Sequence, residues 1–374
     1  VVELARALLR REDVELTLLV RPTAVDYARG ELGLPAGRIV VAPTRRTLAN
    51  SLCERTGLGI PALRRGFDIV HGTKHLLPAS TTATTLLTVH DMTLVERPRD
   101  FAPLKRHLLA RPYLASLRCA DVLVAVSRAA AGQVAAHLPA APAKTEVVPL
   151  AVAPALLTAT PVPVPGLDPS RAALVVSDFS PRKNLPFILR CWPQVQAARE
   201  GATLAIVGPP PRPGSPGARA LTVARRDIAG GVVHLGHVSD AQLRWLYERA
   251  QVTICPSLVE GFGLPALEAV TFSSPVLTST DPALAEASAG RATAIPIGDE
   301  AAWVAAIVTA LAAPRPASTR PAEARSWDQV AEETVAAARS ALQARALASV
   351  ARHHPTDHER GVRTAPRRDR LGAL

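Results

Sequence analysis

Residues 253–270 read T-I-C-P-S-L-V-E-G-F-G-L-P-A-L-E-A-V, and this stretch decides how we interpret the rest of the chain. It begins as the end of a buried strand, continues as a glycine-containing loop after Glu260, and enters a helix with Pro265 in its first turn. Proline favours that position because the first helical N–H has no intrahelical partner to lose. Glu260 and Glu268 lie on either side of the helix N-terminus, whose free amides attract an anion such as a diphosphate. The stretch therefore predicts a strand-loop-helix unit of an α/β domain with an anion site.

Length and composition suit a two-domain protein. The chain has 374 residues, of which 48% are apolar, enough for two cores. Its net charge of +11 would suit a nucleic acid or an anionic membrane as partner. Lysine, however, occurs at only four positions, so arginines scattered along the chain carry most of the charge, and aromatic residues make up only 3%. So few aromatics cannot build base-stacking platforms. We expect a solvated basic surface and no nucleic-acid partner.

The compartment is predicted from the cysteines and from the absence of apolar helices. The four cysteines form no C-x-x-C pair and no metal-ligand spacing, which favours buried thiols in a reducing cytosol. Residues 1–11 lack the pattern of a signal peptide. The longest uncharged run, residues 147–167, contains five prolines, which exclude a membrane helix and indicate an extended linker over 151–170. We expect a cytoplasmic protein with at most peripheral contact at the inner face of the cell membrane.

The first half begins abruptly in a helical pattern. An α/β domain normally opens with a strand and a glycine-containing turn, and neither precedes V-V-E-L-A-R-A-L-L-R-R. Either the sequence is truncated or the protein lacks part of its first sheet. Apolar runs, typical of a parallel sheet covered on both faces, predict strands at residues 14–20, 38–41, 69–71, 85–90, 122–127 and 146–149.

Polar residues follow several of these strands, at the sheet edge where open α/β domains bind ligands. D-I-V-H-G-T starts at Asp68, and T-V-H-D-M-T contains His90. Ser127, before a helix, is expected to cap it. The helix expected around residues 104–118 is basic and partly apolar, which is compatible with an anionic membrane surface but is more common on an ordinary solvated helix.

The second half restarts at residue 172 with a strand, followed by D-F-S-P-R-K-N-L. In a chain that uses arginine almost everywhere, Lys183 indicates that a compact ammonium is required, and Arg182 beside it places two cations opposite the expected diphosphate. Further on, Ser239 or Asp240 is expected to cap a helix. A last helix is predicted over residues 328–346, and the polar residues 349–374 are predicted to form a disordered basic tail.

These motifs, in this order, resemble the retaining glycosyltransferases of family 4, especially their mannosyltransferase-like branch. The resemblance covers roughly residues 1–345 and includes Glu-x7-Glu around G-F-G-L-P, P-R-K-N-L, and A-D-V-L-V-A-V-S. It implies the GT-B fold, in which two Rossmann-like domains face each other across a cleft. Residues 1–150 would form the acceptor-side domain and residues 171–348 the donor domain, whose final helix crosses back over both domains. Val176 and Ser177 depart from the family, which usually has glycine at this place.

The resemblance also implies an activity: transfer of a hexose from a nucleoside diphosphate sugar to a glycan, lipid-linked or small-molecule acceptor, with retention of configuration. Mannose from a guanosine donor is the first expectation, for a cell envelope polysaccharide. No cofactor and no metal ion are expected, because cations already face the diphosphate. The implied catalytic residues are His90 and Glu260. The implied donor-binding residues are Arg182 and Lys183 at the diphosphate, Glu268 at the ribose, Val238 and Asp240 at the base, and Gly261, Phe262, Gly263 and Leu264 around the sugar and phosphates.

Two other functions are compatible with the same motifs. A nucleotide-sugar epimerase of the same fold would need further acid-base residues in the cleft, and none can be singled out. A non-catalytic sugar-nucleotide binder, or an inactive partner subunit, would fit a chain that lacks the first strand and glycine loop. Donor hydrolysis with a panel of nucleotide sugars would separate these possibilities.

Overall fold

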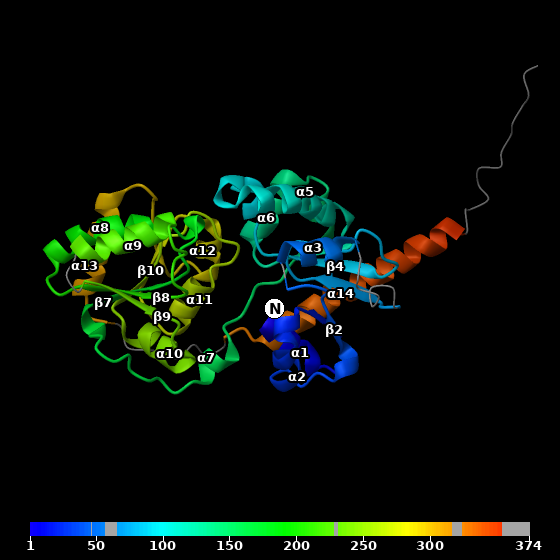
Figure 1. Cartoon of the computed structure of the whole chain (residues 1–374), viewed down its shortest axis with the longest axis horizontal. Coiled ribbons are helices and arrows are strands. Elements are labelled where there is room, and N and C mark those ends of the chain that lie inside the picture. The colour runs from blue at the N-terminus through cyan, green and yellow to red at the C-terminus, as the bar shows by residue number, and fades with distance from the viewer. Residues whose placement is uncertain (46, 57–65, 228–230, 316–323, 354–374) are drawn as a thin grey trace, which may run out of the picture.

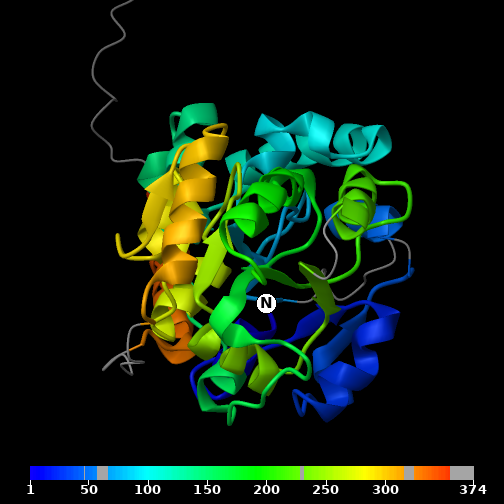
Figure 2. The same ribbon diagram turned by 90° about the vertical axis from the view of Figure 1, so that its left-hand side faces the viewer.

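The computed structural model describes residues 1–45, 47–56, 66–227, 231–315 and 324–353. Two α/β halves lie side by side (Figure 1), and Figure 2 looks from the C-terminal half, with the N-terminal half behind it. Each half contains parallel strands between helices, so the expected α/β fold is confirmed. Within the described residues, no helix is both long and apolar enough to cross a bilayer.

The C-terminal half contains a six-stranded parallel sheet in the order β12-β11-β10-β7-β8-β9. Its strands are β7 (Ala172–Val176), β8 (Thr203–Val207), β9 (Val232–Gly236), β10 (Val252–Cys255), β11 (Val276–Ser279) and β12 (Thr293–Ile295). From β7 the chain builds the sheet outward to β9, then returns to pair β10 with β7 and continues outward to β12. The loops that follow β7 and β10 therefore run in opposite directions at the carboxyl end of the strands. They leave a crevice there, which is the usual ligand site of such sheets.

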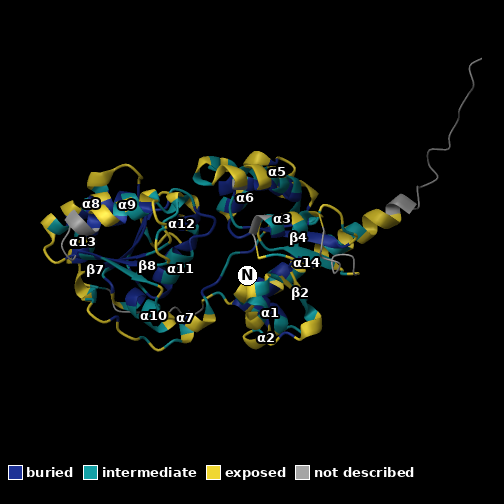
Figure 3. Ribbon diagram, viewed as in Figure 1, coloured by how far each residue is buried: buried dark blue, intermediate teal, exposed yellow. Residues whose placement is uncertain are grey.

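Helices cover both faces of this sheet. One face holds α8 (Leu185–Ala198), α9 (Pro216–Asp227) and α13 (Glu300–Ala312), and the other holds α7 (Pro154–Thr158), α10 (Asp240–Arg249), α11 (Leu264–Thr271) and α12 (Pro282–Ala287). Trp192 and Trp303 are fully buried on the first face. Figure 3 shows the burial of the sheet: buried residues, in dark blue, lie in the strands and on the inner sides of the helices, and the outer sides of the helices are exposed. Alternate residues of β7 and β8 enter the two cores, as expected for strands buried on both faces.

The N-terminal half contains a four-stranded parallel sheet of β3 (Ile69–Gly72), β4 (Thr84–Val89), β5 (Val122–Ala125) and β6 (Thr145–Val147). A separate parallel pair joins β1 (Leu18–Val20) to β2 (Ile39–Val41). The helices are α1 (Val2–Leu9), α2 (Val25–Gly30), α3 (Thr47–Thr56), α4 (Thr93–Glu96), α5 (Pro103–Cys119) and α6 (Arg128–His137). The chain thus begins in a helix, as its sequence indicates, but the first strand is shorter than residues 14–20.

The last helix, α14 (Trp327–His353), packs on the N-terminal half. Its Trp327, Val330 and Ala331 form one core cluster with α1 and with Leu86 and Val124 of the four-stranded sheet. The chain therefore crosses between the halves twice, before β7 and after α13.

Two predicted boundaries need correction. α14 continues to His353, so residues 349–353 are helical and only residues 354–374 of the predicted tail lie outside the described residues. The linker over 151–170 is not extended throughout, because Pro154 starts the short helix α7, whose Leu156 is buried in the core of the C-terminal half.

Candidate functional site

The two halves meet where strands of both sheets end. Gly261, after β10, lies so close to the residue after β4 that a Cβ atom on it would stand 1.5 Å from the carbonyl oxygen of His90. Only glycine fits there. The hydroxyl of Ser127, after β5, donates to the Gly261 carbonyl at 2.5 Å and accepts from the amide of Ala130 at 2.9 Å. Ser127 therefore caps α6 as its sequence predicts, and it also joins the halves.

Two further contacts close this interface. Phe262 is buried against Ala125, Val126 and Ala130 of the N-terminal half. Its side chain thus serves packing between the halves. The carboxylate of Glu286, on α12, accepts from the amides of the first two residues of α6, at 2.9 Å for Arg128 and 3.3 Å for Ala129. These contacts hold the ends of both sheets against each other.

Glu260 is the centre of a buried charge cluster at the crevice between β7 and β10. Its carboxylate accepts from Lys183 Nζ at 2.5 Å, from Arg182 at 2.9 Å and from Ser257 Oγ at 2.7 Å. Only 6% of Glu260 is exposed. Burial by itself would raise the pKa of this carboxyl, but Lys183 and Arg182 outweigh it and the pKa lies below its ordinary value. Lys183, Ser257 and Glu260 line a small cavity between the ends of these strands.

The loop that carries Glu260 is fixed by its neighbours. The amide of Glu260 donates to Asp281 at 3.2 Å, and Asp281 also caps α12 through the amides of Ala283 and Leu284. Gly263, the N-cap of α11, has a φ of +96°, which glycine adopts without strain. Asp281 and Ser257 were not among the residues predicted for the site. An aspartate directly before a proline is a helix-start signature that could have indicated Asp281.

Glu268, on α11, lies in a different environment. It is half-buried and accepts from the hydroxyl of Tyr247 at 2.7 Å. Burial raises its pKa to about 7, the hydrogen bond from Tyr247 opposes that rise, and the charge of Asp240 adds to it. Ser239 rather than Asp240 caps α10, in a capping box with Gln242. Tyr247 is a site residue that the sequence interpretation missed.

The remaining predicted residues surround these two glutamates. Asp240 is exposed in the first turn of α10, and Val238 packs on the core of the C-terminal half. Leu264, the first residue of α11, packs beside Phe262. His90 donates through Nε2 to the Thr73 carbonyl at 3.0 Å, and burial lowers its pKa despite that hydrogen bond. A neutral imidazole with its proton on Nε2 is therefore the favoured form.

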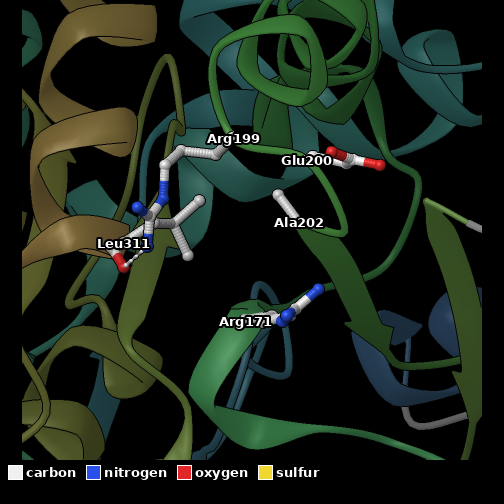
Figure 4. Close-up of a pocket in the computed structure, with 5 residues that line it drawn as sticks. All are labelled: Arg171, Arg199, Glu200, Ala202 and Leu311. Carbon is white, nitrogen blue, oxygen red and sulfur yellow. Dashed lines mark hydrogen bonds between the residues drawn. The ribbon is translucent and has the colours of Figure 1, made fainter.

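A second hollow lies at the amino end of the strands of the same sheet. Figure 4 shows its lining, Arg171, Arg199, Glu200, Ala202 and Leu311, of which Arg171 and Ala202 directly precede strands. None of the predicted site residues is among them. Among the residues that the structure describes, no group of three or more His, Cys, Asp or Glu side chains is placed to hold a metal ion. We locate the candidate site at the Glu260 cluster, at the carboxyl ends of the strands.

Two open parallel sheets with facing carboxyl ends and a cationic crevice define a two-domain α/β protein that can hold an anionic ligand. Residues 1–156 match the model "Glycosyltransferase Family 4" and residues 170–313 match "Glycosyl transferases group 1". The chain belongs to the family 4 glycosyltransferases, and its fold is GT-B. The solved structure of HepE from Anabaena, with UDP and glucose, has this fold with a TM-score of 0.61 at 14% identity, over 93% of this chain and 95% of that one.

Two curated relatives are similar over much of the chain. The D-inositol 3-phosphate glycosyltransferase of Segniliparus rotundus is 31% identical over 73% of this chain. The MMP alpha-(1->4)-mannosyltransferase of Mycolicibacterium hassiacum is 27% identical over 75% of this chain and 72% of its own length. The chain spans 63% of the length of the Segniliparus relative.

Proposed function

We propose that the chain is a retaining hexosyltransferase that moves a sugar from a nucleoside diphosphate donor to a glycan, lipid-linked or small-molecule acceptor. The observation that carries this proposal is the convergence of Lys183 and Arg182 at the crevice between β7 and β10, next to the start of α11. Two cations beside the positive end of a helix dipole suit a diphosphate. Both relatives described above have names that denote glycosyl transfer.

The chemistry follows from stabilisation of the leaving group. As the bond between the sugar and the diphosphate breaks, negative charge grows on the phosphate oxygens, which Lys183, Arg182 and the positive end of α11 would stabilise. The acceptor hydroxyl would attack from the same face and lose its proton to the departing phosphate, which retains the configuration. His90 would face the transferred sugar, and Glu268 would accept from the ribose hydroxyls. With these cations the reaction needs no metal ion, so a chelator should leave the rate unchanged.

Mannose is the sugar that we propose first. The Mycolicibacterium relative is named a mannosyltransferase, and the O-antigen chain mannosyltransferase RfbU of Salmonella typhimurium is 37% identical over 22% of this chain. A guanosine donor and a cell envelope acceptor belong to the same proposal. Transfer assays with mannose, glucose and N-acetylglucosamine donors would rank the sugars, and preference for another sugar would contradict this part alone.

We also propose that the protein is cytoplasmic and binds peripherally to the inner face of the cell membrane. Leu104 and Leu108, one turn apart on α5, are 62% and 49% exposed beside His107 and Arg111. Exposed leucines among basic residues suit the surface of an anionic bilayer. Sedimentation with vesicles that contain anionic lipid should pull down the protein, and replacing both leucines by serine should weaken that binding.

The test of the main proposal uses Lys183. The K183A variant should lose at least about tenfold in donor hydrolysis and transfer, because one stabilising charge on the leaving group is gone. R190A is the matched control, since Arg190 lies on α8 close in sequence but is exposed. If the wild-type protein binds nucleotide sugars but neither hydrolyses nor transfers them, the chain is a non-catalytic binder and the enzyme proposal is wrong.

A further inference from the structure

Tyr247 is the residue from which we draw a further inference. It lies on α10, is fully buried with 0% exposure, and donates its hydroxyl hydrogen to Oε2 of Glu268 at 2.7 Å. Resting on the proposed function, in which Glu268 binds the ribose, we propose that Tyr247 is a positioning residue. It holds Oε2 of Glu268 so that Oε1 is presented to the ribose hydroxyls of the nucleotide.

Tyr247 is held through both its ring and its backbone. It stacks on Phe272 with 6.0 Å between ring centroids and 15° between planes, and Arg244 lies 5.5 Å from the centroid of that same phenylalanine. The backbone carbonyl of Tyr247 accepts from Arg315 at 2.6 Å. A side chain held in this way loses little further entropy when it orients a partner, which is what a positioning residue requires.

Packing alone does not explain a tyrosine here. Phenylalanine would fill almost the same space, and a buried hydroxyl costs free energy unless it is hydrogen-bonded. The hydroxyl has its partner in Glu268, a half-buried carboxylate. The hydrogen bond to that glutamate therefore explains why a tyrosine, and not a phenylalanine, occupies this position. The pair joins α10 to α11.

Glu268 depends on Tyr247 because no cation assists it. Among the residues that the structure describes, Glu268 forms no ion pair and its Oε1 accepts no hydrogen bond, whereas Glu260 has two cations. The other titratable groups that face it are Asp240 at the start of α10 and Cys255 at the end of β10, and neither offers a positive charge at neutral pH. The tyrosine hydroxyl is therefore the one described donor that stabilises the ionised carboxylate.

This arrangement makes donor binding sensitive to pH. The pKa of Glu268 is about 7, since burial raises it and Tyr247 limits the rise. Ionised Glu268 accepts from the ribose hydroxyls, so donor affinity should increase as the pH rises through about 7. Removing the hydroxyl of Tyr247 should move this midpoint to higher pH. A tyrosine that only fills space would not move it.

The first experiment measures the dissociation constant of a nucleotide sugar between about pH 5.5 and 8.5. Y247F should weaken binding roughly three- to tenfold at neutral pH and shift the midpoint upward by about half a unit or more. Y27F is the control, because Tyr27 is exposed in the N-terminal half and should change neither quantity. E268Q should bind weakly with no midpoint near neutral pH. An unshifted midpoint in Y247F would overturn the inference.

A second measurement needs no donor, so it separates this inference from the proposed function. Because the folded-state pKa of Glu268 exceeds its ordinary 4.5, the folded state binds the proton more tightly, and stability should fall as pH rises from about 4.5 to 7. Y247F should extend this fall to higher pH in the wild-type background and have no such effect in the E268Q background. Equal pH profiles in both backgrounds would contradict a positioning role. If no nucleotide sugar binds but this coupling is found, the proposed function fails while the pairing stands.

Discussion

Glu260 shares its carboxylate between Lys183 and Arg182, the cations that we expect to hold the diphosphate. In this arrangement the charges of the crevice are already compensated. A bound diphosphate must therefore draw the two cations away from Glu260 or share them with it. The carboxylate that orients the cations also competes with the ligand for them.

This competition gives a prediction for E260Q. Without the negative charge, Lys183 and Arg182 should attract a free nucleoside diphosphate several-fold more tightly, while sugar transfer should fall at least about tenfold because the loop and sugar are less well held. The unpaired cations should also lower stability by about 2–4 kcal/mol.

Calorimetric titration and thermal unfolding measure both effects. The control is E300Q, because Glu300 contacts Arg190 at 3.8 Å on the surface and should change neither. Unchanged or weaker diphosphate binding in E260Q would mean that the carboxylate does not compete.

The site residues also show which features of the site can be predicted from the sequence. The types of side chain at the site were predictable, since Lys183, Glu260 and Glu268 lie in motifs with a clear chemistry. Their partners were not. We expected the cations to be free for a ligand, and the structure pairs them with Glu260. Tyr247 and Asp281 lie 21 residues from the glutamates that they contact, a separation for which no helical or strand periodicity predicts a contact.

At the scale of elements, the start of α6 is capped from both halves of the molecule. Ser127 supplies the cap from its own chain segment, and Glu286 of α12 adds two hydrogen bonds from the other half. A carboxylate at a helix N-terminus is favoured by the free amides and by the helix dipole. The same contact that stabilises the helix therefore also favours the closed arrangement of the halves.

We predict that E286A shifts the molecule toward an open arrangement. The loss should be roughly 0.5–2 kcal/mol, enough to raise the radius of gyration measured by small-angle X-ray scattering. D299A is the matched control, because Asp299 caps α13 within one half. That variant should lose similar stability and keep its radius. The same radius in both variants would show that Glu286 does not hold the halves together.

Elements were predictable where the sequence has a strong period or a clear stop. The apolar runs of β4, β5, β7 and β10 lie within a residue or two of where we expected strands, because both faces of each are buried. The predicted end of α14 was wrong, because the charged residues, histidines and proline that follow Ser349 show little apolar periodicity and suggested a tail. Residues 347–353 contain no proline or glycine, so nothing stops the helix there.

At the scale of the whole molecule, the N-terminal half is not a single continuous segment. The four-stranded sheet of the first half uses α14, from the far end of the described chain, to cover Leu86, Val122 and Val124. Both crossings between the halves must therefore be in place before the first core is complete.

We predict that W327A unfolds the first half preferentially. Trp327 is buried at the start of α14, so its removal should cost about 3–5 kcal/mol. Hydrogen exchange should become faster in β4 and β5 and change little in β7 and β8. W245A is the matched control, because Trp245 packs on the core of the second half and should affect β7 and β8 instead. Faster exchange throughout both halves in W327A would indicate that they unfold as one unit.

The late position of α14 also has a consequence for synthesis of the protein. A ribosome completes β6 long before it reaches Trp327, and at ~5–20 residues per second the delay is roughly 10 to 40 s. Most of this time is spent in synthesising the donor half, whose last core helix, α13, is complete shortly before Trp327, while α14 does not yet cover the first sheet. We therefore expect the donor half, in the middle of the chain, to fold first, and α14 to pack on α1 and the first sheet last.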